Sequence, residues 1–323
     1  MKIADMHCDT ISRIYHEKRA GRTVHLRENT FQVDLCRMKT SGYLLQNFAA
    51  FVELKPGVDP YVQAKEEISL FREEIAGNSE EIGWVTSYED IVKNEKTGKM
   101  SALLTLEEGA VCQGELAKLH EFYQLGVRMM TFTWNFQNEL GSPAEPAEKL
   151  KEAYGLTEKG REFLAEMERI GMIADVSHLS DEGILDVCRL ANKPFVASHS
   201  NARALCKRMR NLPDELIRKI AEKGGVIGVN FYGPFLTDQA DERGNYYGRI
   251  EDVVRHATYL RNLAGTEAIA LGTDFDGIDE YLELSHCGQM ERLWNALKSH
   301  GWKESELDAM FYRNVCRLYR ELL

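Results

Sequence analysis

The stretch "KIADMHCD", residues 2–9, decides the fold, because an apolar, strand-like run ends there in two polar side chains, His7 and Asp9. Seven further runs of strand length follow it, with helix-like stretches between them. They occupy residues 44–53, 101–108, 127–134, 171–178, 194–200, 224–232 and 268–277. Eight strands that alternate with helices predict an α/β fold with a single closed, parallel (β/α)8 TIM-type barrel.

The rival architecture is an open, doubly wound sheet. That fold usually carries a glycine-rich turn after its first strand, whereas the turn here reads "MHCDT" (6–10). No linker rich in Pro, Gly or Ser interrupts the alternation, so we expect residues 1–323 to form one barrel domain. The last segment, "KESELDAMFYRNVCRLYREL" (303–322), predicts an additional C-terminal helix that packs outside the barrel.

The net charge, the apolar runs and the cysteines of the sequence indicate which partners the protein binds and in which cell compartment it lies. The formal net charge of −11 argues against a nucleic-acid surface and favours a small-molecule substrate. No apolar run is long enough to cross a bilayer, and the N-terminus lacks the pattern of a signal peptide, so we expect no membrane partner. The seven cysteines form no CxxC pair, which is typical of reduced thiols and predicts a cytoplasmic protein.

Most of the predicted strands are apolar along their length and polar only at their C-terminal ends. A barrel brings these ends together at one mouth. The polar residues are His7 and Asp9, Glu107 and Glu108, His178, His199, and Asp274 and Asp276. Side chains two apart on a strand share a face, so His7 and Asp9 both point into the barrel.

Three imidazoles and several carboxylates are costly to bury together unless they coordinate a cation. The mixture of imidazole and carboxylate suits Zn²⁺, with Mn²⁺, Co²⁺ or Fe²⁺ as substitutes. Five ligands exceed what one catalytic zinc uses, so we expect two ions that share a bridging carboxylate. Glu107 is the natural bridge, but the strand period leaves Glu108 open as the alternative. Asp274 is the candidate proton carrier, and the turn around Asp276 suits local hydrogen bonding.

These motifs together resemble the membrane dipeptidase (renal dipeptidase) family of binuclear zinc peptidases, within the amidohydrolase-like barrels. The resemblance covers nearly the whole chain. It is carried by "HCD" (7–9), "LEEGA" (106–110), "YQLGVR" (123–128), "ADVSHLS" (174–180), "ASHSNARALC" (197–206), "RNLPDELI" (210–217), "GVNFY" (228–232) and "GTDFDG" (272–277).

The resemblance implies roles for individual residues. It places one ion on His7 and Asp9, the other on His178 and His199, and the bridge on Glu107, whose distance to "YQLG" (123–126) matches the family better than that of Glu108. The remaining assignments are Asp274 as the catalytic Asp, Arg210 as the partner of the substrate carboxylate, and Tyr232 as a substrate-binding residue. The family also implies a possible homodimer.

Trp134 departs from the family pattern, because the mammalian enzymes carry a His at this place. An indole N–H can donate a hydrogen bond but cannot carry a proton, so we expect Trp134 to contact substrate and to alter specificity and rate.

The expected function is a metal-dependent dipeptidase of broad specificity that accepts a D-residue at the C-terminal position. A hydroxide bridging the metals would attack the peptide carbonyl, with Glu107 and Asp274 as catalytic residues. An N-acyl amino acid deacylase or a lactonase using the same site is the alternative. A third hypothesis is a non-catalytic metal-binding barrel.

Overall fold

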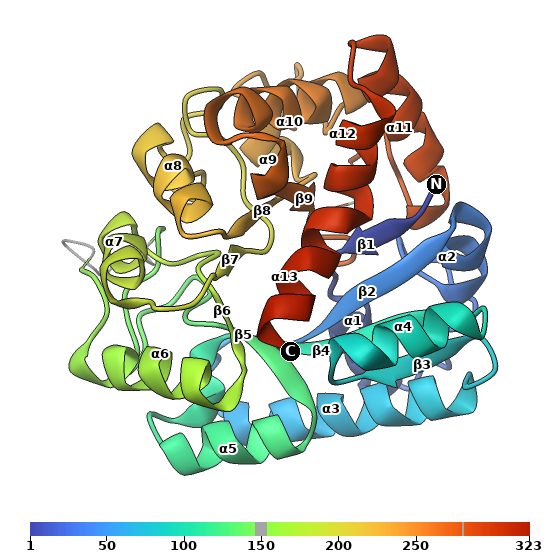
Figure 1. Ribbon diagram of the computed structural model, residues 1–323. Helices are drawn as coiled ribbons and strands as arrows, with labels where there is room; N and C mark the ends of the chain where they lie inside the picture. Colours follow the sequence, from blue (N-terminus) through green and yellow to red (C-terminus); the bar gives the residue numbers. More distant parts are fainter. Residues whose placement is uncertain (146–153, 280) are drawn as a thin grey trace.

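The computed structural model describes residues 1–145, 154–279 and 281–323, and its centre is a parallel β-barrel (Figure 1). Eight strands form the barrel: β1 (Ile3–Asp5), β2 (Tyr43–Phe51), β4 (Met100–Glu107), β5 (Val127–Thr131), β6 (Ile173–Asp175), β7 (Val196–Ala197), β8 (Val226–Val229) and β9 (Ile269–Leu271). The strand order is β2-β1-β9-β8-β7-β6-β5-β4, and pairing of β2 with β4 closes it. Each strand overlaps one predicted run, so the predicted TIM-type barrel is confirmed.

One strand was not predicted. β3 (Ile82–Val85) pairs with Met100–Leu103, the first half of β4. The second half of β4 pairs with β5 along the same edge. Its sequence, "IGWV", is too short to show a strand pattern. β3 extends the sheet beside the barrel without taking part in its closure.

Helices surround the barrel in the described part of the chain (Figure 1). They are α1 (Thr10–Arg19), α2 (Leu35–Ser41), α3 (Pro60–Gly77), α4 (Tyr88–Lys96), α5 (Leu116–Gln124), α6 (Glu158–Ile170), α7 (Asp181–Leu190), α8 (Asp214–Glu222), α9 (Gly233–Leu236), α10 (Ile250–Ala264) and α11 (Met290–Ser299). Local sequence sets their ends. The side chain of Thr157, for example, accepts the N–H of Gly160 at the start of α6, and the helix ends at Gly171, which has a φ of 83°. None of the described helices is long and apolar enough to cross a membrane.

The C-terminal segment forms the predicted helix outside the barrel strands, and it covers one end of the barrel (Figure 1). It consists of α12 (Glu304–Asp308), a π-helical turn (Ala309–Arg313) and α13 (Asn314–Leu322). Figure 1 shows α13 lying across the end of the barrel. Val315, Leu318 and Tyr319 join the apolar cluster inside the barrel, and Asn47 of β2 donates a hydrogen bond to the hydroxyl of Tyr319 at 2.6 Å.

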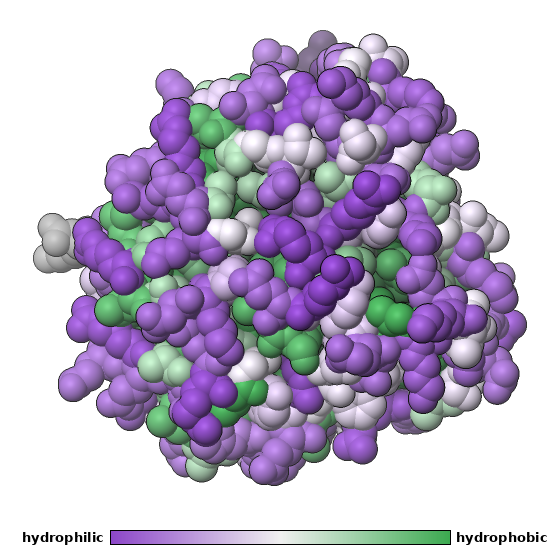
Figure 2. Space-filling model, in the orientation of Figure 1, coloured by the Kyte–Doolittle hydropathy of each residue, from purple (hydrophilic) through white to green (hydrophobic). Residues whose placement is uncertain are grey.

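This inner cluster explains where α13 binds. Three of its residues, Ile173, Val196 and Val226, are the first residues of their strands, so the cluster reaches the N-terminal end of the barrel. A second apolar cluster fills the space between the barrel and the outer helices. On the face that carries α13, hydrophilic residues dominate and apolar ones gather in separate patches (Figure 2). With one end closed by α13, the polar strand ends lie at the opposite end.

Candidate metal centre

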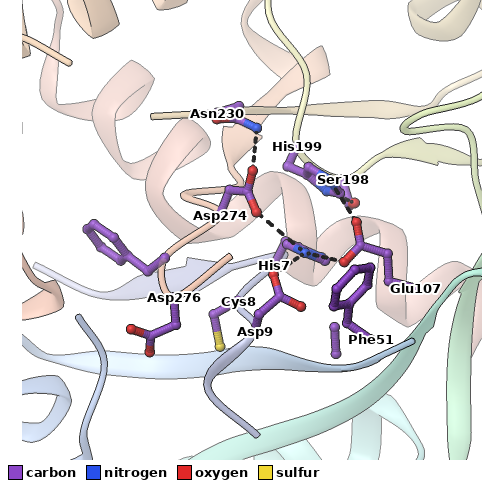
Figure 3. Close-up of polar contacts among 12 residues, drawn as sticks. His7, Cys8, Asp9, Phe51, Glu107, Ser198, His199, Asn230, Asp274 and Asp276 are labelled. Atoms are coloured by element: carbon purple, nitrogen blue, oxygen red, sulfur yellow. Dashed lines mark hydrogen bonds and ion pairs between the residues drawn. The ribbon is translucent and has the colours of Figure 1, made fainter. Parts of the chain in front are cut away.

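Polar side chains from five strands meet at the C-terminal end of the barrel. The residues are His7 and Asp9 after β1, Glu107 at the end of β4, His178 after β6, His199 after β7 and Asp274 after β9. Each is at most 8% exposed. Figure 3 shows His7, Asp9, Glu107 and Asp274 pointing toward one another. The structure thus brings together residues that lie up to 267 positions apart in the chain.

Glu107 lies at the centre of the cluster, with its two carboxylate oxygens facing different imidazoles. Oε1 is 3.1 Å from Nε2 of His178 and 3.5 Å from Nε2 of His199. Oε2 is 3.3 Å from Nε2 of His7, which also lies 3.2 Å from Oδ2 of Asp9. One carboxylate therefore separates two groups of nitrogen and oxygen atoms, as a bridging ligand does.

The other ring nitrogens are held by neighbours. Nδ1 of His178 donates to Oδ1 of Asn135 at 3.0 Å, and Nδ1 of His199 lies 2.7 Å from the hydroxyl of Ser198. With the ring protons on Nδ1, both Nε2 lone pairs point at Glu107, and the two Nε2 atoms are only 3.0 Å apart. Facing lone pairs repel each other unless a cation lies between them.

Two further observations fit divalent cations at this site. Oδ1 of Asp9 is buried and has no hydrogen-bond partner. Ligand atoms of His7, Glu107 and His199 all lie within 4.8 Å of one another, as do those of His7, Asp9 and Asp274. Imidazole and carboxylate together are the donor set that zinc and similar divalent ions bind. The residues present therefore fit a pair of cations.

Burial shifts the pKa values of two carboxyls and two imidazoles of the cluster. It raises the pKa of Glu107 to about 8 and that of Asp274 to about 7, because a carboxylate loses its hydration there. Burial also lowers the pKa of His178 and of His199 well below the usual range, which keeps both imidazoles neutral. Neutral imidazoles are ready to bind a cation, whereas the carboxyls must release protons to it.

Glu108, the alternative to Glu107, faces away from the cluster. Its carboxylate accepts the backbone N–H of Ala110 at 2.8 Å and of Trp134 at 3.0 Å, and it also binds the amide of Asn138. Its φ of 106° interrupts the strand alternation directly after Glu107. Glu108 therefore fixes the segment that carries Trp134.

Asp274 and Asp276 differ in their surroundings. Asp274 accepts a hydrogen bond from the amide of Asn230 at 2.8 Å, and its other oxygen lies 3.7 Å from Nε2 of His7. Asp276 points away from the cluster (Figure 3). The prediction of local hydrogen bonds for Asp276 is wrong. Its carboxylate accepts hydrogen bonds from distant parts of the chain, from the hydroxyl of Thr10 at 2.6 Å and from the N–H of Gln32 at 2.7 Å. The short spacing of "DFDG" gave no signal for those distant partners.

The predicted substrate-binding residues lie at and near the mouth. A cavity of about 230 Å³ opens above Glu107 and is lined by Trp134 and Tyr232, among others. Arg210 lies behind the cavity, 4% exposed, where it donates to the hydroxyl of Ser200 and to the carbonyl of His199, both at 2.9 Å. Its Nε is buried without a partner.

Sequence reasoning missed the residues that support the cluster. Ser198 links His199 to Asp175, Asn135 holds His178, and Phe51 lines the cavity. Asp175 and Ser198 lie within three residues of the predicted histidines, which is the only signal that the sequence offers for them. Nothing in the sequence around Phe51 marks it.

Comparison with known proteins supports one family. The family model described as membrane dipeptidase, peptidase family M19, matches residues 1–322. A protein of the pqqA 5′ region of Klebsiella pneumoniae is 33% identical over 273 residues, which cover 83% of this chain and 98% of that protein. Dipeptidase 3 of the mouse is 29% identical over 307 residues, or 93% of this chain, but the match spans only 60% of the mouse protein.

A solved structure agrees. The metallopeptidase of Rhodobacter sphaeroides, determined with a phosphinate mimic of the dipeptide L-Ala-D-Ala, is 25% identical and has a TM-score of 0.90, with 100% of this chain and 99% of that chain covered. The model match over almost the whole chain, together with the barrel, establishes the relationship. The chain belongs to the membrane dipeptidase family, peptidase family M19.

Proposed function

We propose that this protein is a binuclear metallo-dipeptidase that uses zinc and hydrolyses the single peptide bond of small dipeptides, including those with a C-terminal D-residue. The observation that carries the proposal is the position of Glu107, whose two oxygens face His7 on one side and His178 and His199 on the other. Membership of a dipeptidase family supports the choice of reaction.

The proposed ligands follow from this arrangement. His7 and Asp9 would hold one cation, His178 and His199 the other, and Glu107 would bridge them. Bound divalent cations supply Lewis-acid polarisation of a carbonyl and activation of water at neutral pH. The neutral state of the two imidazoles and the unpartnered oxygen of Asp9 support this assignment.

Asp274 is the proposed proton carrier. One of its carboxylate oxygens lies 3.7 Å from Nε2 of His7, beside the proposed ligands, which is a suitable place for a general acid–base group. The amide of Asn230 holds one carboxylate oxygen at 2.8 Å, which orients the other toward the cluster. In this role Asp274 takes a proton from the attacking water and returns it to the departing amine.

Arg210 is the proposed partner of the substrate carboxylate. Each of its two Nη atoms donates one hydrogen bond, to Ser200 and to the carbonyl of His199, so three of the five guanidinium N–H groups are left as donors for a substrate carboxylate. Tyr232 lines the cavity on the same side. A carboxylate bound this close to the cluster leaves room for one residue beyond the scissile bond, which limits substrates to dipeptides.

The test is a substrate panel with metal control. The protein is freed of metal with a chelator, restored with Zn²⁺, Mn²⁺, Co²⁺ or Fe²⁺, and assayed on L-Ala-D-Ala, L-Leu-D-Ala and an N-acetyl amino acid. We expect restored turnover of the dipeptides. Cleavage of the N-acetyl compound alone would favour the deacylase, and no turnover with any metal would favour a binding protein; either result refutes the proposal.

A further inference from the structure

Aromatic side chains form a wall on one side of the charged cavity. Phe51 ends β2 and Trp134 follows β5, and their ring centroids lie 4.9 Å apart in an edge-to-face arrangement at 63°. Phe136 packs against this wall, with its ring 5.6 Å from that of Trp134, but it does not itself line the cavity. All three side chains are half-buried. Exposed aromatic surface beside a polar site is typical of a pocket that binds an apolar group.

The wall is held rigidly next to the cluster. Glu108 accepts the backbone N–H of Trp134 at 3.0 Å, and the indole lies 6.2 Å from the ring of His178, centroid to centroid. Asn135, the next residue, binds Nδ1 of that same imidazole. The position of Trp134 is therefore fixed relative to the proposed reacting centre.

The barrel order gives the wall a direction relative to substrate. Arg210 binds Ser200, which follows β7, while Tyr232 follows β8 and Asp274 follows β9. On the wall, Phe51 is the last residue of β2 and Trp134 follows β5. These two sets of strands lie on opposite sides of the barrel, with Glu107 of β4 at the cluster. A dipeptide whose carboxylate points toward Arg210 therefore lays its first residue toward the wall.

We propose that Phe51 and Trp134, with Phe136 packed against Trp134, form an apolar subsite for the side chain of the first residue of the dipeptide, so that the enzyme prefers bulky apolar first residues over small or acidic ones. This inference rests on the proposed function. Hydrophobic pockets discriminate by roughly tenfold or more for each methylene they bury. We therefore expect kcat/KM for L-Leu-D-Ala and L-Phe-D-Ala to exceed that for L-Ala-D-Ala by at least about tenfold, and L-Asp-D-Ala to be the poorest substrate.

The test compares wild type with Trp134→Ala, Phe51→Ala and the conservative Trp134→Phe, each checked for metal content. The two alanine variants are expected to lower the Leu-to-Ala ratio of kcat/KM about tenfold, mainly through KM, and Trp134→Phe to restore part of it. Two variants on different strands guard against one that fails to fold. A wild-type ratio near one, or alanine variants that keep the wild-type ratio, would overturn the subsite.

Binding of non-hydrolysable analogues separates this inference from the proposed function. Phosphinate mimics of L-Leu-D-Ala and L-Ala-D-Ala are titrated calorimetrically into the metal-loaded protein. Tighter binding of the Leu mimic, lost in Trp134→Ala, supports the subsite even if no dipeptide is cleaved. Cleavage of dipeptides with equal affinity for the two mimics retains the dipeptidase and rejects the subsite.

Discussion

Ser198→Ala is expected to weaken metal binding, because Ser198 fixes the tautomer of His199. Its hydroxyl lies 2.7 Å from Nδ1 of His199 and donates to Asp175. The carboxylate of Asp175 is a hydrogen-bond acceptor in each of its described contacts. It also accepts the N–H of Ser177 at 3.0 Å and the hydroxyl of Thr131 at 2.9 Å. Because the hydroxyl hydrogen of Ser198 points to Asp175, the hydroxyl oxygen accepts a hydrogen bond from Nδ1–H of His199. The proton of the imidazole is then on Nδ1, and Nε2 is free to bind a cation.

The magnitude follows from what the substitution removes. Loss of such a supporting partner typically lowers metal affinity about 10- to 100-fold, or about 1.4–2.8 kcal/mol. His199 is fully buried, so no water replaces the hydroxyl without rearrangement. The substitution also leaves Nδ1 of His199 and one oxygen of Asp175 without this hydroxyl partner, which lowers the free energy of unfolding of the metal-free protein by about 1–3 kcal/mol.

The assay is competition for zinc between the metal-free protein and a chelating dye, with denaturant unfolding measured in parallel. Ser142→Ala is the matched control, because Ser142 is also a fully buried serine but its hydroxyl has no hydrogen-bond partner. Unchanged zinc affinity in Ser198→Ala would refute the reasoning. So would an equal loss in the Ser142 control.

Three further predictions follow from the site and the core. Asp274→Asn is expected to lower kcat by about 10²- to 10⁴-fold with two metal equivalents retained, and a loss below tenfold contradicts its role as proton carrier. Arg210→Gln is expected to lower kcat/KM for L-Ala-D-Ala at least about 30-fold, because the variant loses the partner of the substrate carboxylate. The slower hydrolysis of L-Ala-D-Ala amide, which has no carboxylate, is expected to stay unchanged, and equal losses for both compounds contradict carboxylate recognition. Burial lowers the pKa of His256 to about 4, below about 6.5 in the unfolded chain, so its neutral form stabilises the fold above pH 6.5 and this stability is lost as the pH falls toward 4. Between pH 6.5 and 4, the free energy of unfolding in urea should fall by up to ~3 kcal/mol less in His256→Phe than in wild type. If the free energies of unfolding of the two proteins change with pH in parallel, the assignment is contradicted.

The barrel and its cluster could be predicted because most of the barrel strands are apolar along their length and polar only at their C-terminal ends. The parallel order then brings distant residues such as His7 and His199 to one mouth. The choice between Glu107 and Glu108 needed the backbone, because the φ of 106° at Glu108 turns the second carboxylate away from the barrel. Spacing along a strand does not contain that information.

Long-range packing could not be predicted. The apolar face of α13 predicts burial, but it does not tell whether Tyr319 packs against the outer helices or inside the barrel end. Likewise, Phe51 and Trp134 lie 83 positions apart, and only closure of the barrel brings their rings together. The β3 segment is too short for a periodic signal.

The most direct test of the binuclear site is anomalous X-ray scattering from crystals of the zinc-loaded protein, with data collected on both sides of the zinc absorption edge. The proposed ligands predict two peaks, one beside His7 and Asp9 and one beside His178 and His199, with Glu107 contacting both ions. A single peak, or peaks away from Glu107, would contradict the central claim that this carboxylate joins two metal ions.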